Sequence, residues 1–122
     1  MNISIIIPCY NEEEVLPLTL KSLKALALDL VSRKNCDEIE FVMVDDGSQD
    51  RTAELLTEAS KADKRVKVIR FSRNFGHQAA LLGGYELAQG DVIVSLFYRE
   101  DRGFKNKTKA ENFAKNSVTI RS

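Results

Sequence analysis

The chain has 122 residues, 43% of them hydrophobic and 30% charged, and its 18 Lys and Arg residues balance 18 Asp and Glu residues. This length and composition fit one globular domain and exclude an intrinsically disordered chain. The zero net charge argues against a nucleic-acid binder that depends on overall basicity. No apolar run approaches the ~20 residues of a membrane span. Because the first residues lack a secretion signal and the two cysteines lack metal-ligand spacing, we expect reduced thiols in a cytoplasmic protein.

The balanced charge hides a difference between two parts of the chain. Residues 1–98 hold 11 basic and 15 acidic residues, whereas residues 99–122 hold 7 basic and 3 acidic ones. The last part is also poor in aliphatic residues, although residues 118–120 could add a short strand. We therefore expect one domain over residues 1–96 and a divergent basic tail over residues 97–122, frame-shifted or partly disordered.

Short apolar runs alternate with longer amphipathic segments through the first part. The β-branched and apolar runs predict strands at 3–7, 39–44, 66–69 and 92–96. Helical patterns fill the intervals between these runs. Strands that alternate with helices predict βαβ units, and therefore a parallel sheet with helices on both faces.

The first helix should begin after the polar segment that follows the first strand. Asn11 can act as its N-cap, and Glu12, Glu13 and Glu14 would suit its positive end. Apolar residues at helical spacing then predict a buried stripe of Val15, Leu18, Leu26 and Leu30, widened by Leu16, Leu20, Leu23 and Ala27.

Polar residues follow the first three strands, at the edge where ligands bind in open parallel sheets. The chain has no G-x-G-x-x-G turn and no P-loop, so dinucleotide-binding and P-loop folds lose their main signal. Carboxylates here can accept bonds from the N–H of a base or the O–H of a ribose. Tyr10 can pack on a flat base, and Arg70 or Arg73 can face phosphate charge. The edge predicts a small-molecule site.

Three ordered blocks carry a family resemblance. They are Ile5-Ile6-Ile7-Pro8-Cys9-Tyr10-Asn11-Glu12-Glu13, Val44-Asp45-Asp46-Gly47-Ser48-Gln49-Asp50-Arg51-Thr52 and Ser72-Arg73-Asn74-Phe75-Gly76-His77-Gln78-Ala79-Ala80-Leu81. Over about residues 2–96 the chain resembles family 2 glycosyltransferases, most closely the branch that loads a sugar onto polyprenyl or dolichyl phosphate. The resemblance implies a Rossmann-like GT-A half-domain with strand order 3-2-1-4.

The resemblance also implies a role for each block. The first block would line the base and ribose pocket, the two aspartates would hold the base above a Gly-Ser turn, and the third block would frame the diphosphate side. The implied nucleotide-binding residues are Pro8, Tyr10, Asn11, Glu12, Asp45, Asp46, Gly47, Ser48, Arg73 and Asn74.

The chain departs from the family after the fourth strand. The family carries an Asp-x-Asp motif there for Mg²⁺ or Mn²⁺, but this sequence has Phe97-Tyr98-Arg99. Phe and Tyr supply no carboxylate, and a hard divalent cation needs oxygen ligands. We therefore expect this chain not to bind the family's divalent metal, and we assign no catalytic residue. We also expect the family's acceptor half to be missing from this chain.

These features leave two functions open. In the first, the chain is a truncated transferase of lipid-linked sugar biosynthesis with little or no activity. Its parent would move a sugar from a nucleotide-sugar, with a UDP-sugar favoured and GDP-mannose second, to an acceptor such as polyprenyl phosphate at the cytoplasmic face of a membrane. In the second, the chain is an inactive module. We expect a homo-oligomer because the flank of the fourth strand stays uncovered unless the tail fills it.

Several residues also have purely structural interpretations. The Asp-Asp-Gly-Ser segment is typical of turns. We expect His77 to have a surface or capping role and Cys9 to pack in the core. Gly83 and Gly84 lie inside a helix, which predicts a close approach between that helix and the sheet.

Overall fold

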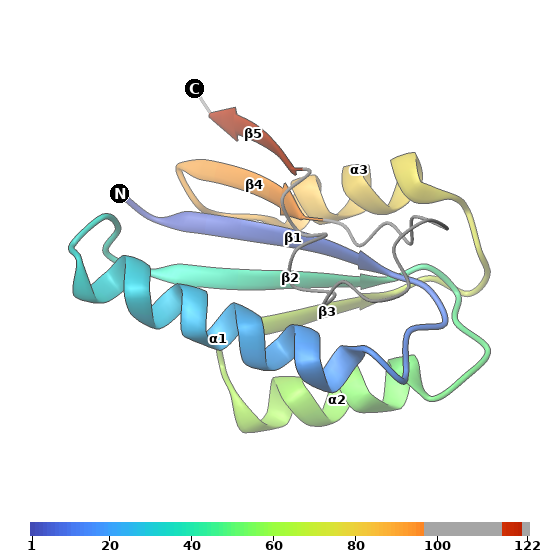
Figure 1. Cartoon of the computed structure of the whole chain (residues 1–122). Coiled ribbons are helices and arrows are strands. Elements are labelled where there is room, and N and C mark those ends of the chain that lie inside the picture. The colour runs from blue at the N-terminus through green and yellow to red at the C-terminus, as the bar shows by residue number, and fades with distance from the viewer. Residues whose placement is uncertain (97–115, 121–122) are drawn as a thin grey trace, which may run out of the picture.

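The computed structural model describes residues 1–96 and the backbone of residues 116–120. Four parallel strands form the sheet, and a fifth strand, β5 (Asn116–Ile120), pairs antiparallel with the fourth. The parallel strands are β1 (Ile3–Cys9), β2 (Ile39–Asp45), β3 (Val66–Arg70) and β4 (Val92–Leu96). The strand order is β3-β2-β1-β4-β5, which confirms the predicted 3-2-1-4 order and adds β5 beside β4 (Figure 1).

Three helices cover the two faces of the sheet. Helices α1 (Leu16–Ser32) and α2 (Thr52–Ala62) lie on one face, and α3 (His77–Leu87) lies on the other (Figure 1). Side chains alternate between the faces along each strand. The strand residues packed toward α1 and α2 include Ile5, Ile7, Phe41 and Met43, whereas those packed toward α3 include Ile6, Val42, Val44 and Ile93. Both faces of the central strands are buried, as expected for a parallel sheet.

Helix α1 begins later than the sequence predicts. Its N-cap is Val15, and no side chain caps the helix, so the prediction of Asn11 as N-cap is wrong. Asn11 has φ +49° and uses its side chain elsewhere, and the three glutamates precede the first helical turn. Pro17 lies in the first turn, where a missing N–H leaves no intrahelical bond broken.

The buried stripe of α1 also differs from the predicted one. Leu16, Leu23 and Ala27 are buried, whereas Leu18 and Leu26 are exposed. The residues expected only to widen the stripe are therefore its centre. The packing of α1 on β1 and β2 decides which of its side chains are buried.

The two glycines within α3 allow the close approach that the sequence predicts. A Cβ on Gly84 would lie 2.4 Å from Ile6 Cγ2 and 3.3 Å from Val44 Cγ2. A Cβ on Gly83 would lie 3.1 Å from the Phe71 ring. The absence of side chains here brings α3 onto the sheet.

A polar network joins the strands at the amino edge of the sheet. Glu40 accepts bonds from the Ser4 hydroxyl and from the Gln89 N–H (2.7 Å), and it pairs with Lys67 at 2.6 Å. Burial opposes ionisation of Glu40, but these hydrogen bonds outweigh it and hold the pKa of this carboxyl below its ordinary value. The network is at the end of the sheet opposite the polar strand ends.

Candidate functional site

Two neighbouring cavities open at the carboxyl edge of the sheet. The Glu12 cavity has a volume of about 270 Å³ and is lined by Pro8, Cys9, Tyr10, Glu12, Asp46, Asn74, Gly76 and His77. The Arg73 cavity has a volume of about 410 Å³ and is lined by Tyr10, Gly47, Ser48, Gln49, Arg70, Phe71, Ser72, Arg73 and Asn74. Tyr10 and Asn74 line both. Eight of the ten predicted binding residues therefore lie around one pair of cavities, and Asn11 and Asp45 are not among the lining residues.

The register of the sheet explains this convergence. Cys9 pairs with Asp45 in β1 and β2, and Asp45 pairs with Arg70 in β2 and β3. The three strands therefore end side by side, and the loop after each strand begins at the same edge. Residues that are far apart in the sequence meet there because parallel strands point the same way.

Asn11 joins the loops after β1 and β2 instead of lining a cavity. Its N–H donates to the Ser48 hydroxyl at 2.9 Å, and its side-chain oxygen accepts the Gln49 N–H at 2.8 Å. Asn tolerates the left-handed backbone conformation that this residue adopts. Asn11 therefore fixes the relative position of these two loops without lining either cavity.

Asp50 supports the same pair of loops. Its carboxylate accepts the N–H of Thr52 at 2.9 Å and the N–H of Glu13 at 3.2 Å, while the Thr52 hydroxyl accepts the Glu12 N–H at 2.8 Å. Burial opposes ionisation of Asp50, but the hydrogen bonds from Thr52 and Glu13 hold its pKa below the ordinary value. The backbone of Glu12 is thus anchored before any ligand binds.

Asp45 and Asp46 occupy different environments. Asp45 is fully buried, and one of its oxygens accepts the Ser48 N–H at 3.1 Å. Its other oxygen lies 3.9 Å from Arg70 Nε and has no hydrogen-bond partner among the described residues. Asp45 therefore shapes the turn below the cavities.

Asp46 lines the Glu12 cavity and also anchors the loop after β3. One carboxylate oxygen accepts the Phe75 N–H at 2.8 Å, and the other accepts the Gly76 N–H at 3.1 Å and the Asn74 amide at 3.2 Å. A carboxylate has about four acceptor sites, so three bonds leave room for one further donor. Of the two adjacent aspartates, Asp46 is therefore the one that can reach a ligand in this cavity.

Gly47 brings the loops after β2 and β3 into close contact. It has φ +74°, and a Cβ there would lie 2.2 Å from the Arg73 carbonyl carbon. Glycine is needed both for the left-handed conformation and for this approach. The two cavities depend on it because their walls come from both loops.

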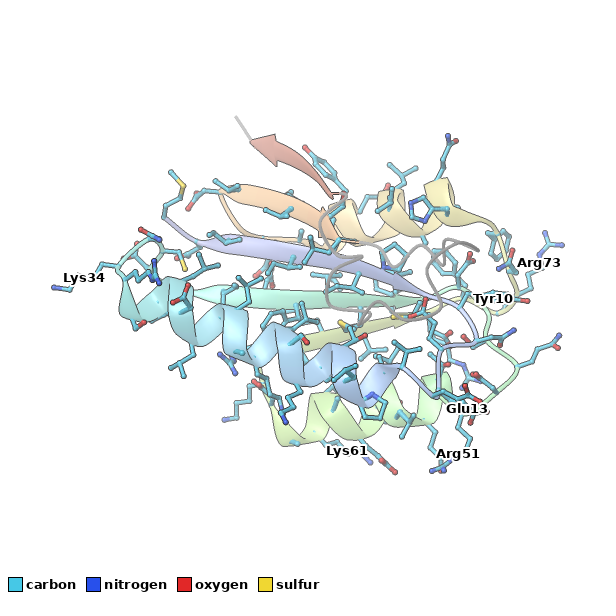
Figure 2. The ribbon with its side chains drawn as sticks, in the orientation of Figure 1. Tyr10, Glu13, Lys34, Arg51, Lys61 and Arg73 are labelled. Atoms are coloured by element: carbon cyan, nitrogen blue, oxygen red, sulfur yellow. The ribbon has the colours of Figure 1, made fainter. Side chains whose placement is uncertain are left out.

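The Arg73 cavity has an aromatic and cationic rim. Tyr10 is 44% exposed, and Figure 2 shows it at the same end of the molecule as Arg73. The Arg73 guanidinium lies 4.6 Å from the centroid of the Phe75 ring. The loop that carries Arg73 follows β3, and two strands, β2 and β1, lie between β3 and β4 in the sheet. The role of Arg73 beside a diphosphate stays a prediction.

The structure adds lining residues that the sequence did not predict as binding residues. Gly76 and His77 line the Glu12 cavity because α3 begins at its wall, and Cys9 lines it from the end of β1. The third sequence block contains Gly76 and His77, so their position next to Asn74 was the available signal. Burial, and then the charges of Glu12 and Asp45, raises the pKa of the Cys9 thiol, which fits a packing role for Cys9.

The family description "Glycosyl transferase family 2" matches residues 4–96. The chain belongs to this family. The resemblance that the three sequence blocks carry is thereby confirmed, and so is the GT-A fold, since the solved structures it matches are glycosyltransferases.

Among the curated relatives of this family 2 chain is the undecaprenyl-phosphate 4-deoxy-4-formamido-L-arabinose transferase of Pectobacterium atrosepticum, 43% identical over 96 residues. That match covers 78% of this chain and 28% of the relative, so the chain spans little more than a quarter of the relative's length.

Among solved structures, S. aureus TarS 1-349 in complex with UDP-GlcNAc is 26% identical with a TM-score of 0.62, covering 80% of this chain and 26% of the TarS 1-349 chain. The mannosyltransferase PcManGT of Pyrobaculum calidifontis, solved with GDP-Man and Mn²⁺, is 21% identical with a TM-score of 0.53, covering 78% of this chain and 26% of that protein. The second similarity concerns the fold alone.

Three further observations concern metal ions, the Phe97-Tyr98-Arg99 segment and membrane helices. Within residues 1–96 and 116–120, no three His, Cys, Asp or Glu side chains gather as ligands for a metal ion. The segment with Phe97-Tyr98-Arg99 lies outside the described residues. No helix in the described part of the chain has the length and apolar character to cross a bilayer.

Proposed function

We propose that residues 4–96 bind the nucleotide part of a nucleotide-sugar, with a UDP-sugar favoured and GDP-mannose second. The observation that carries this proposal is the convergence of Tyr10, Glu12, Asp46 and Asn74, from three sequence blocks, on one cavity of about 270 Å³. The similarity to TarS, whose structure contains UDP-GlcNAc, supports it.

The chemistry of the cavity suits a base and a ribose. Asp46 has one acceptor site left for an N–H of uracil or guanine, and an ionised acceptor makes a stronger bond than a neutral one. Glu12 supplies a second carboxylate for ribose hydroxyls, on a backbone held by Thr52. The half-exposed ring of Tyr10 offers a flat apolar surface to the base.

In the whole protein, we propose that this nucleotide site serves sugar transfer to polyprenyl phosphate at the cytoplasmic face of a membrane. The name of the Pectobacterium relative supports the acceptor class, and the two buried free cysteines support a reducing compartment. In the family, Mg²⁺ or Mn²⁺ neutralises the leaving diphosphate.

The residues present do not fit the metal of the family. Phe97-Tyr98-Arg99 replaces the Asp-x-Asp motif, and Phe and Tyr offer no carboxylate to a hard cation. We assign no step to a metal in this chain. We propose that this chain binds nucleotide and transfers little or no sugar.

The alternative is an inactive module that self-associates. The flank of β4 that the sequence analysis expects to stay uncovered is paired with β5. The described outer strands are then β3 and β5, whose free backbone groups could pair with a second copy. Light scattering at high concentration tests this alternative: a dimer supports it, and a monomer contradicts it.

Calorimetric titration of the full chain with UDP and GDP, with and without Mn²⁺, tests the nucleotide site. We expect binding that does not depend on Mn²⁺. Glu12→Gln should weaken this binding, whereas Glu13→Gln is the matched control because Glu13 does not line either cavity. Absence of binding to either nucleotide would refute the proposal, and binding enhanced by Mn²⁺ would contradict the statement about the metal.

A further inference from the structure

Arg73 is held differently from the other arginines that the structure describes. Each of the other four has a carboxylate within 3.9 Å: Arg33, Arg51, Arg65 and Arg70. Arg73 has no such partner among the described residues. Its guanidinium lies 4.6 Å from the centroid of the Phe75 ring, and no carboxylate of the described residues forms an ion pair with it.

Phe75 is fixed from two sides although half of it is exposed. Its N–H donates to Asp46 at 2.8 Å, and its ring packs edge-on against Phe71 with centroids 5.6 Å apart at 88°. The residue is nevertheless 50% exposed. The loop after β3 thus exposes a large apolar side chain next in sequence to Asn74, which lines both cavities, and the Arg73 guanidinium lies against its ring.

A guanidinium that packs on an aromatic ring keeps its charge, and the N–H donors in its plane stay available. Arg73 also lines the cavity that it shares with Tyr10 and Asn74. We propose that Phe75 is a positioning residue, which holds Arg73 so that it donates to acceptor oxygens of the bound nucleotide. This inference rests on the proposed nucleotide site. The oxygens can belong to a phosphate or to the base.

Binding of UDP and of uridine to the full chain tests the role of Phe75. NMR titration is suitable because it measures weak dissociation constants. Phe75→Leu should weaken UDP binding by about two- to fivefold, the effect of one exposed cation–π contact, and Phe75→Tyr should preserve it. In a chain that already carries Arg73→Met, Phe75→Leu should have no further effect. Tyr85→Leu on α3, which removes another partly exposed ring, is the control and should bind UDP normally.

The two ligands identify the oxygens that Arg73 contacts. A loss for both UDP and uridine in Phe75→Leu supports oxygens of the uridine part as the source, and a loss confined to UDP supports the phosphates. The inference is overturned if Phe75→Leu binds UDP as wild type does, or if it causes an equal loss in the Arg73→Met background. If the wild-type chain binds neither ligand, the proposed nucleotide site itself fails together with this inference.

Discussion

Substitution of Gly47 by alanine should both destabilise the chain and separate the two loops that line the cavities. A Cβ at this position would lie 2.2 Å from the Arg73 carbonyl carbon and 2.4 Å from the Asn74 nitrogen. Both are backbone atoms, so no rotation of a side chain relieves the overlap. The loop after β3 must therefore move away from the turn after β2.

Two contributions set the size of the effect. A left-handed conformation costs a non-glycine residue about 1–2 kcal/mol. Overpacking of an already close contact costs roughly 1–3 kcal/mol more. The expected loss of about 2–5 kcal/mol is large against the ~5–15 kcal/mol by which domains are usually stable.

Urea unfolding of Gly47→Ala beside Gly76→Ala separates these contributions. Gly76 also has a positive φ, +101°, but a Cβ there meets nothing within 4 Å, so its substitution adds only backbone strain, about 1–3 kcal/mol. Gly47→Ala should be the less stable variant and should bind UDP more weakly than Gly76→Ala. Equal stability and equal UDP affinity in the two variants would refute the close-contact argument.

Three further substitutions test the packing and the polar anchors. Asp46→Asn replaces an acceptor oxygen with an N–H group facing other N–H groups, so urea unfolding should show a loss of about 1–3 kcal/mol. Gly84→Ala should lower the thermal midpoint, because overlap with Ile6 costs roughly 1–3 kcal/mol and exceeds the ~1 kcal/mol gain in helix propensity. Glu40, whose pKa is lowered despite burial, stabilises the fold above its ordinary pKa, and this contribution is lost as pH falls through the lowered value. Glu40→Gln should therefore destabilise the chain at pH 7 and differ less from wild type in acid; a difference that does not change with pH would contradict this.

The sequence predicts the turn that contains the two adjacent aspartates, but it does not predict which of them lines a cavity. The Asp-Asp-Gly-Ser pattern predicts a turn and an acidic strand end, and both are present. Asp45 follows Phe41 and Met43 toward the α1 face, whereas Asp46 falls on the side of α3 and meets the loop after β3. Side chains alternate along a strand, so the register of β2 decides which acid lines a cavity.

Tertiary contacts, and not residue type, also decide the role of Asn11 and the burial of the leucines of α1. Asn11 has a residue type that suits both an N-cap and a left-handed turn, and only its neighbours Ser48 and Gln49, 37 and 38 positions away, select the turn. Leu16 and Leu18 are equally apolar, and only packing on the sheet buries the first and exposes the second.

The sequence by itself determined the alternation of strands and helices, the parallel sheet and the three blocks of the site, because apolar periodicity and strand-end residues are local properties. The tertiary structure alone decided the start of α1, the pairing of β5 with β4 and the hold of Phe75 on Arg73. The start of α1 and the pairing of β5 depend on contacts between distant segments, and the loop that carries Arg73 and Phe75 is anchored by the bond from the Phe75 N–H to Asp46, 29 positions away. No local pattern encodes such contacts.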